Sequence, residues 1–450
     1  MKMRWLVPIF GIVLVLVFSI ARGALSPDSV NRSELDNGMV ILTMEEHSVP
    51  LAAVVLMFHV GQKNDPIGLT GLTHVCEWVF SEGTAAFEKG EYHRIIQAGG
   101  GTTRSETTLD VTYVMTRIPS DMLDTVLVLE ADRMRNIELT YEKLMLARDV
   151  MRKNRNLMVE SSIYGNINEE IMNLSYRSHP YRNPAYGWPE DIANITVDDM
   201  EKHFRLYFQP GNAVMVILGD FETAPTVARV DSLFGYNVSD PLPEHRHIGE
   251  PRHVGERRSY LEGFSGIPAF IVAYHIPHLT HPDIPAIRLI SNILSDGESS
   301  RLHKRLVTDE NAAVRIGGGF FELEDPSLIY AFAIMNYDVD NEVGAEQMTD
   351  EINRLKSELI SEAELVKAKN RVKANSYREI RSIDRQGMRL AYYQITAGSW
   401  QFVDDKLTAV ADVSREDIRQ AARKYFIPAN RSLVFLSPIK PGDTIDEEDY

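Results

Sequence analysis

The sequence predicts an α+β protein made of two homologous halves, and two internal repeats support this prediction. Residues 195–214 and 413–432 each start a helix with a Thr/Ser-x-x-Asp cap, end it at Tyr-Phe-x-Pro and continue into an apolar strand. A second pair, 139–154 and 360–375, has nearly the same spacing, about 220 residues. Each half is therefore expected to place helices on one face of a mixed sheet.

Strands are expected in the first half at 40–44, 52–60 and 107–117. The glycine run at 99–101 lacks the strand, lysine and helix of a phosphate loop, so it is interpreted as a turn that leads into a strand.

The composition is that of an ordinary globular protein, with 44% hydrophobic and 25% charged residues. The formal net charge of −17 argues against nucleic acid and anionic lipid surfaces as partners. Cys76 is the single cysteine, which excludes an internal disulfide, and it is expected to be a small core residue.

Residues 1–23 have the pattern of a secretory signal peptide. Lys2 and Arg4 precede an apolar run at 5–21, and Ala21-Arg22-Gly23 supplies a small-x-small cleavage site. The chain is therefore expected to be exported to the periplasm or another extracytoplasmic space. An uncleaved N-terminal membrane anchor is the alternative.

The remaining chain is long enough for two domains, and a polar, proline-containing stretch separates them. Its histidines, His245 and His247, are interpreted as solvated residues. The expected divisions are an N-terminal domain at 30–236, a linker at 237–258, a C-terminal domain at 259–440 and an acidic tail at 441–450.

The stretch 71–84 contains the main chemical signal of the sequence. It is predicted to be a helix, in which His74 and Glu77 are one turn apart and share a face. Imidazole can hold zinc and carboxylate can polarise a water molecule, so this pair is half of a hydrolytic zinc site. A second ligand is expected four residues after His74, but Trp78 stands there, and an indole has no lone pair for a metal.

Gly-Leu-Thr-His-Val-Cys-Glu-Trp at 71–78 resembles the inverted zinc motif His-x-x-Glu-His of the pitrilysin/insulinase metallopeptidases. The resemblance runs from about residue 33 to the end, and further matches lie at 35–38, 47–50, 80–84, 107–113, 130–134 and 179–181. It implies two α/β-sandwich halves of the LuxS/mitochondrial-processing-peptidase-like type.

The resemblance also implies a third metal ligand, the last residue of Glu-Arg-x-Val-x-x-x-Glu on a later helix. Here the corresponding stretch begins at Ala147 and ends at Asn154, and a neutral amide brings no negative charge to zinc. Of the three ligands only His74 remains, as a vestigial ligand, with Glu77 as a vestigial general base. No cofactor is expected.

Two substrate-binding features of the family are changed as well. The family's edge strand captures an extended peptide by β-augmentation and carries Asn-Ala-x-Thr, whereas this chain has Arg104, Ser105, Glu106 and Thr107. The family's substrate-binding Arg and Tyr follow a Ser-Arg-Leu motif; that motif is present at 300–302, but the two positions are occupied by Val307 and Val314.

These observations predict an exported, non-catalytic homologue that acts as a structural or regulatory subunit, paired with a homologous catalytic zinc peptidase or with itself. One alternative is an active zinc metallopeptidase with unorthodox ligands, for which His93, Asp149, Glu82 and Glu106 are candidates. Another alternative is a chamber that binds extended peptides without cleaving them.

Overall fold

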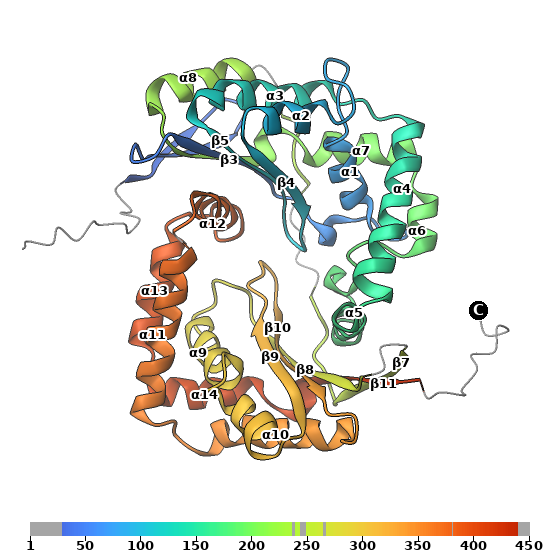
Figure 1. The fold of residues 1–450 in the computed structure, drawn as a ribbon, viewed down its shortest axis with the longest axis vertical. Helices are drawn as coiled ribbons and strands as arrows, with labels where there is room; N and C mark the ends of the chain where they lie inside the picture. The colour runs from blue at the N-terminus through green and yellow to red at the C-terminus, as the bar shows by residue number, and fades with distance from the viewer. Residues whose placement is uncertain (1–28, 236–238, 244–248, 264–266, 380, 440–450) are drawn as a thin grey trace, which may run out of the picture.

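Two sheets, one in each half of the chain, form the framework of the protein (Figure 1). The computed structural model describes residues 29–235, 239–243, 249–263, 267–379 and 381–439. The predicted signal peptide, the acidic tail, His245 and His247 lie outside the described residues.

The N-terminal sheet has six strands in the order β1-β2-β6-β3-β5-β4. Its central strands β3 and β6 are apolar along almost their whole length, as expected for strands that are covered on both faces. The strands are β1 (Asn31–Glu34), β2 (Val40–Glu45), β3 (Leu51–Phe58), β4 (Thr102–Thr107), β5 (Thr112–Pro119) and β6 (Ala213–Gly219).

The C-terminal sheet repeats this plan in the order β7-β11-β8-β10-β9. In each sheet the last strand of the half pairs in parallel with an early strand, β6 with β2 and β11 with β7. The first sheet has one further strand, β1, which pairs antiparallel with β2. The strands are β7 (Arg257–Gly263), β8 (Ala269–Ile276), β9 (Ala313–Phe320), β10 (Ser327–Met335) and β11 (Arg431–Pro438).

The helices follow the same repeat. Capping boxes start α7 at Thr196 and α14 at Ser414, which confirms the repeated element predicted from the sequence. The first half contains α1 (Leu72–Phe80), α2 (Glu91–Ala98), α3 (Leu123–Asn136), α4 (Tyr141–Arg155), α5 (Ile163–Ser175), α6 (Pro189–Asn194), α7 (Val197–Tyr207) and α8 (Thr223–Phe234). The second half contains α9 (Ile284–Ser295), α10 (Asn341–Ser357), α11 (Glu362–Glu379), α12 (Ile383–Thr396), α13 (Phe402–Asp412) and α14 (Arg415–Tyr425).

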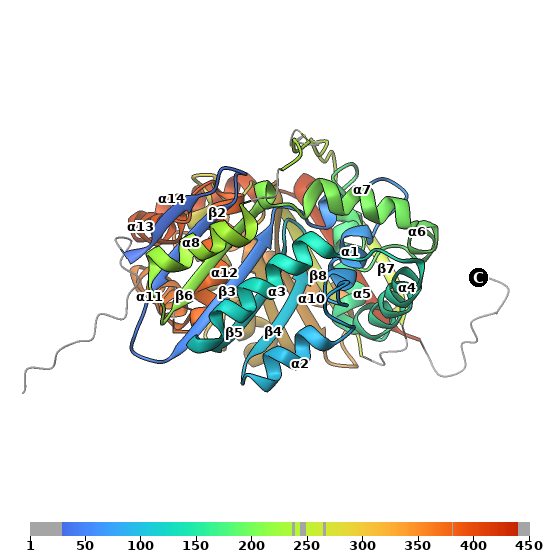
Figure 2. The same ribbon diagram turned by 90° about the horizontal axis from the view of Figure 1, so that it is seen from above.

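Each half places its own helices on one face of its sheet and receives a helix from the other half on the opposite face. Figure 2 shows α3 and α8 lying across the N-terminal strands, where they close a core with β3 and β6. The other face of that sheet is covered by α12, whose Leu390 and Ala391 share a core with Val55 and Val216. Gly387 allows this approach, because a Cβ there would lie 2.9 Å from Val55 Cγ2.

The exchange is reciprocal. Helix α5 of the first half packs on β8 and β11 of the second (Figure 1), and its Ile167 and Ile171 are buried with Ala273 and Val434. The two halves therefore share hydrophobic cores in addition to having cores of their own.

The predicted strand 107–117 is wrong in one respect, because it spans two strands. Thr107 ends β4, and β5 begins at Thr112. Between them Thr108 closes a tight turn, in which its Oγ1 accepts a hydrogen bond from the Val111 amide at 3.1 Å. The edge strand of the sheet is therefore β4, and β5 lies inside the sheet between β3 and β4.

The predicted linker at 237–258 overlaps the C-terminal sheet, since β7 begins at Arg257. Its described part is held against the end of α5: Glu250 accepts hydrogen bonds from the amides of Arg177, Ser178 and His179. Within the described ranges, no helix is both long enough and apolar enough to cross a membrane.

Candidate functional site

Helix α1 carries the motif, and its position is fixed by apolar packing and by one buried carboxylate. Leu72, Val75 and Val79 lie in the N-terminal core. The N-cap, Gly71, has no side chain, and Asp65 replaces it by accepting hydrogen bonds from the amides of Gly71 (2.7 Å) and Thr73 (2.8 Å). Burial raises the pKa of Asp65 to about 7, although its hydrogen bonds with Thr73 and Gly71 oppose the shift.

His74 is buried and faces the end of the edge strand. Burial lowers the pKa of its imidazole to about 4, against a hydrogen bond with the backbone of Thr107 that acts in the other direction. The Tyr186 ring lies 5.5 Å away, centroid to centroid, and His74 Nδ1 has no hydrogen-bond partner among the described residues. His74 is therefore a neutral imidazole at neutral pH, with one nitrogen unused.

Glu77 lies one turn further along α1 and is partly buried. Burial raises the pKa of its carboxyl to about 7; a hydrogen bond with Ser105 opposes the shift, and the charge of Glu106 adds to it. A carboxylic acid that titrates near neutral pH has the property of a general base or acid. Glu77 keeps this property here without a complete set of metal ligands beside it.

Trp78, at the predicted second ligand position, packs partly buried against the N-terminal core. Lys89 Nζ lies 5.5 Å from the centroid of its ring, in a cation–π contact. The indole is therefore held by apolar packing and by a cation, and the positive charge of Lys89 also disfavours a metal ion there.

Helix α4 packs against α1 and contains the third predicted ligand position. Asn154 is partly buried near its end, and Ala147 is fully buried on the core side. Neither side chain carries a charge. In the part of the chain that the structure describes, no group of three or more His, Cys, Asp and Glu side chains could hold a metal ion. The residues at the three positions thus do not fit zinc.

The candidates for unorthodox ligands do not converge on His74. Asp149 lies on the exposed side of α4 and pairs with Arg152 at 2.9 Å. Glu82 pairs with Lys89 at 2.8 Å. His93, on α2, is partly buried with its ring against Tyr92. Burial lowers the pKa of His93, and nearby Arg133 acts in the same direction.

Glu106, the fourth candidate, lies on β4 and accepts a short hydrogen bond from the hydroxyl of Tyr113. Arg104 is exposed on the same strand, and its guanidinium carbon lies 5.8 Å from the centroid of the Tyr113 ring. Ser105 points to the other face, where its Oγ lies 3.3 Å from Ser81 Oγ behind α1. Charged and small side chains therefore alternate between the two faces of β4, with Ser105 on the side of Glu77.

Among the strands that the structure describes, β4 pairs only with β5, from Thr102 opposite Arg117 to Thr107 opposite Thr112. Its outer backbone edge is unpaired among the described strands, which is the geometry that β-augmentation requires. The four residues predicted for substrate capture therefore lie on the edge of the sheet, beside α1.

The two valines of the second half differ in their exposure to solvent. Val307 is partly buried against the C-terminal core in a π-helical turn (His303–Asp309). Val314 lies on the edge strand β9 with 64% of its surface exposed. Neither has a polar atom that could bind a peptide carbonyl.

Sequence reasoning missed two aromatic residues of the site, Tyr186 and Tyr113. Both rings lie beside the motif helix or its strand, yet neither is close to His74 in sequence. Tyr186 precedes Gly187, which has a φ of +70° and whose Cβ would lie 2.2 Å from the Thr70 carbonyl oxygen. An aromatic residue before a glycine next to the motif helix gives only a weak sequence signal, since the proximity is tertiary.

The comparisons with known proteins agree with this architecture. Residues 40–187 match the family model described as insulinase (peptidase family M16), and residues 194–372 match the model described as peptidase M16 inactive domain. The first segment lies within the first half, and the second runs from α7 of the first half to α11 of the second. The chain belongs to the insulinase family.

A zinc protease of Helicobacter pylori, named PqqE, is 26% identical over 409 residues, which is 90% of this chain and 92% of that protein. The crystal structure of a protease from Helicobacter pylori superposes with a TM-score of 0.87 and 25% identity, covering 91% of this chain and 99% of that one. A structure titled peptidase M16 inactive domain, from Pseudomonas fluorescens, gives a TM-score of 0.83 at 17% identity, covering 93% and 100%, and so supports the fold alone.

Proposed function

We propose that this chain is an exported, non-catalytic insulinase-family protein that serves as a structural or regulatory subunit of a complex with a catalytic zinc peptidase homologue. The main support for the proposal is the identity of the residues at the metal-ligand positions. On α1 and α4, Trp78 and Asn154 stand where an imidazole and a carboxylate would be required. His74 and Glu77 remain, but a hydrolytic zinc site needs three protein ligands and one open position.

The packing of Trp78 supports the proposal. Its indole lies against the core under Lys89 as part of the apolar structure, and in no rotamer does it offer a lone pair to a metal ion. The proposal also accounts for the retained fold, because α1 is held by Asp65 and by core contacts that do not involve a metal.

An exposed apolar strip supports the pairing with a second subunit. Its members belong to α4, the following π-helical turn (Asn156–Glu160) and the start of α5, segments that follow one another along one side of the ribbon in Figure 1. Apolar side chains gathered on a surface mark sites of protein contact more often than scattered ones do. The members of the strip are Tyr141, Met145, Leu146, Leu157, Met158 and Tyr164.

The proposal is tested by metal content, peptidase activity and co-purification. After incubation with zinc and gel filtration, the chain should retain well under one equivalent of metal and cleave no quenched-fluorescent peptide. Isolation of the tagged chain from its host should recover a homologue that contains His-x-x-Glu-His. One equivalent of zinc, together with activity that both a chelator and Glu77→Gln abolish, would establish the active-enzyme alternative instead.

The free edge of β4 supports a second function, peptide binding without proteolysis. An extended peptide labelled with a fluorophore should then bind and remain intact. Ser105→Pro, which removes one amide from the strand, should weaken this binding if the edge is used. Asp149→Asn, on the exposed face of α4, is the control that should leave it unchanged.

A further inference from the structure

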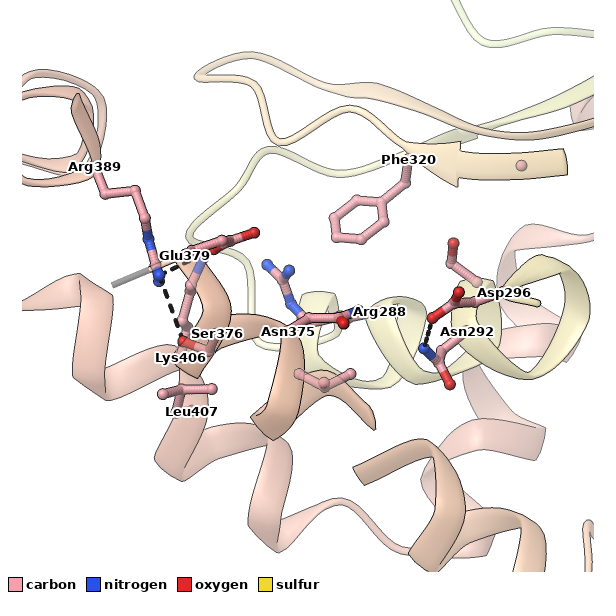
Figure 3. Close-up of a pocket in the computed structure, with 13 residues that line it drawn as sticks. Arg288, Asn292, Asp296, Phe320, Asn375, Ser376, Glu379, Arg389, Lys406 and Leu407 are labelled. Atoms are coloured by element: carbon pink, nitrogen blue, oxygen red, sulfur yellow. Dashed lines mark hydrogen bonds and ion pairs between the residues drawn. The ribbon is translucent and has the colours of Figure 1, made fainter. Parts of the chain in front are cut away.

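A cavity of about 240 Å³ lies in the C-terminal half, away from α1, between α9, α11, α12, α13 and β9 (Figure 3). Three basic side chains line it and are largely shielded from solvent: Arg288 is 17% exposed, Arg389 13% and Lys406 11%. So many cations around one small cavity are costly unless anions compensate them.

Most of this charge is compensated from outside the cavity or from its rim. Glu322, behind the wall, pairs with Arg288 and Lys406. Burial lowers the pKa of Lys406 to about 8, and the charges of Arg288 and Arg389 act in the same direction, against the attraction of Glu322. The Lys406 amine thus lies close to other cations, and a bound anion would reduce the repulsion between them.

Arg389 is the side chain whose hydrogen bonds are incomplete. Its Nη1 lies 2.9 Å from Glu379, which is 47% exposed, and donates to Ser376 Oγ at 3.4 Å (Figure 3). Its Nε and Nη2 are buried and have no partner among the described residues. An unsatisfied buried donor is unfavourable, so an acceptor that reaches these two nitrogens would be bound there.

Two other arginines of this half show what the unused edge of Arg389 is suited to bind. Arg371 holds Asp296 through Nε and Nη2 at 2.6 and 2.8 Å, and Arg301 holds Glu364 through the same two atoms at 2.9 and 3.1 Å. This bidentate geometry matches a carboxylate.

One part of the remaining cavity wall is polar, formed by Ser291, Asn292, Asn375 and by Asp296, whose charge is paired with Arg371. The other part is apolar and suits a hydrophobic group beside the carboxylate. Phe320, Val372 and Leu407 line it, and the Phe320 ring lies 5.0 Å from the guanidinium carbon of Arg288. The volume exceeds the roughly 150 Å³ of an engineered cavity that holds benzene, so a phenyl ring and a carboxylate fit together.

We propose that this cavity binds the carboxylate of a small ligand that carries an apolar side chain, with Arg389 as the bidentate anchor and Arg288 and Lys406 as supporting charges. Glu379, which pairs with Nη1 of Arg389, leaves the Nε and Nη2 edge open but opposes the ligand by its negative charge. The ligand class includes an N-acylated apolar amino acid and the C-terminal residue of a peptide. This site is independent of the function proposed above.

The test uses N-acetyl-L-phenylalanine and its uncharged amide, titrated into the full chain by calorimetry. The acid should bind at least about tenfold more tightly than the amide, since only the acid fills the Arg389 fork. Arg389→Gln should weaken binding of the acid by about tenfold or more. Glu379→Gln should strengthen it, because it removes a negative charge that neutralises Arg389 and repels the ligand carboxylate, at an exposed position where folding is not at risk.

Arg301→Gln is the matched control, as it removes a similarly buried, bidentate arginine outside the cavity and should leave affinity unchanged. Ala-Ala-Ala-Phe with a free or an amidated C-terminus identifies the source: tighter binding of the free form supports a peptide terminus, and binding of the acetylated amino acid alone supports a small acid. Three results would overturn the proposal: acid and amide bind with equal affinity, inorganic phosphate displaces the acid as effectively as unlabelled acid does, or Glu379→Gln binds the acid no more tightly than the wild type.

Discussion

The two halves of the molecule share one strand plan but differ in what they do with charge. In the first half, α1 carries His74 and Glu77 beside an indole and an amide, and burial drives both ionisable groups toward their neutral forms. In the second half, a cavity below α12 collects three basic side chains that stay close to counter-ions. The comparison teaches that apolar packing maintains the common fold, while polar chemistry varies independently in each half.

A buried ion network around Lys63 joins the two halves, and its loss is expected to have the largest effect on stability. Lys63 is 5% exposed and contacts Asp110 at 2.9 Å in its own half, and Glu324 at 2.5 Å in the other. Lys63→Met should reduce the free energy of unfolding by about 3–5 kcal/mol, because two carboxylates lose their buried partner. Urea denaturation followed by circular dichroism measures this loss.

Lys202→Met, at an exposed ion pair on α7, is the control and should leave the free energy of unfolding almost unchanged, because solvent screens this pair. A loss below 1 kcal/mol in Lys63→Met would mean that the ion network does not tie the halves together.

The second effect concerns the ligand positions of the first half. Trp78→His combined with Asn154→Glu should raise zinc affinity by about 100-fold or more, because it adds an imidazole and a negative charge to His74. Competition with a chromophoric chelator measures the affinity. Trp78→His with Asn154→Gln is the control of equal size without the charge. No gain in the first variant would show that the surroundings of α1 and α4 keep the ligands apart.

The third effect is a dependence of the free energy of unfolding on pH, caused by Glu77. Glu77 is protonated below pH 4.5 in both states, but at higher pH the unfolded chain ionises first, because the folded pKa is about 7. Glu77 therefore lowers stability as pH rises from 4.5 to 7, by about 2 kcal/mol after allowance for its partial exposure. Glu77→Gln removes this loss, so its advantage over the wild type should grow between pH 4.5 and 8.

Urea denaturation at several pH values measures the difference in the free energy of unfolding between Glu77→Gln and the wild type. The titration of His74 contributes equally to both proteins and drops out of this difference. Glu201→Gln, on the exposed face of α7, should show no such growth. A constant difference between Glu77→Gln and the wild type would contradict the raised pKa.

The smallest effect separates the two valines of the second half. Val307 packs against the core, so Val307→Ala should cost about 1 kcal/mol of stability. Val314 is mostly exposed on β9, and Val314→Ala should cost less than about 0.5 kcal/mol. Thermal unfolding measures both, and a larger loss for Val314→Ala would indicate that this edge is covered by another segment or subunit.

Several elements of the fold could be predicted because their signals are local. The helix of the motif was expected at 71–84 and runs from Leu72 to Phe80, since its apolar spacing and the turn residues around it lie within one stretch. The strands at 40–44 and 52–60 match β2 and β3 closely. The strand at 107–117 was misjudged because Thr108 forms a turn inside an otherwise strand-like composition.

The sequence by itself determined the two-half plan, the family and the residues at the ligand positions, because each of these follows from local patterns and residue types. Only the tertiary structure decided that α5 covers the C-terminal sheet and α12 the N-terminal sheet. It also decided that Lys63 contacts Glu324, and that one cavity is lined by Arg288, Arg389 and Lys406. These contacts join residues far apart in the chain, and their energies come from burial and charge pairing that exist only once both halves have folded together.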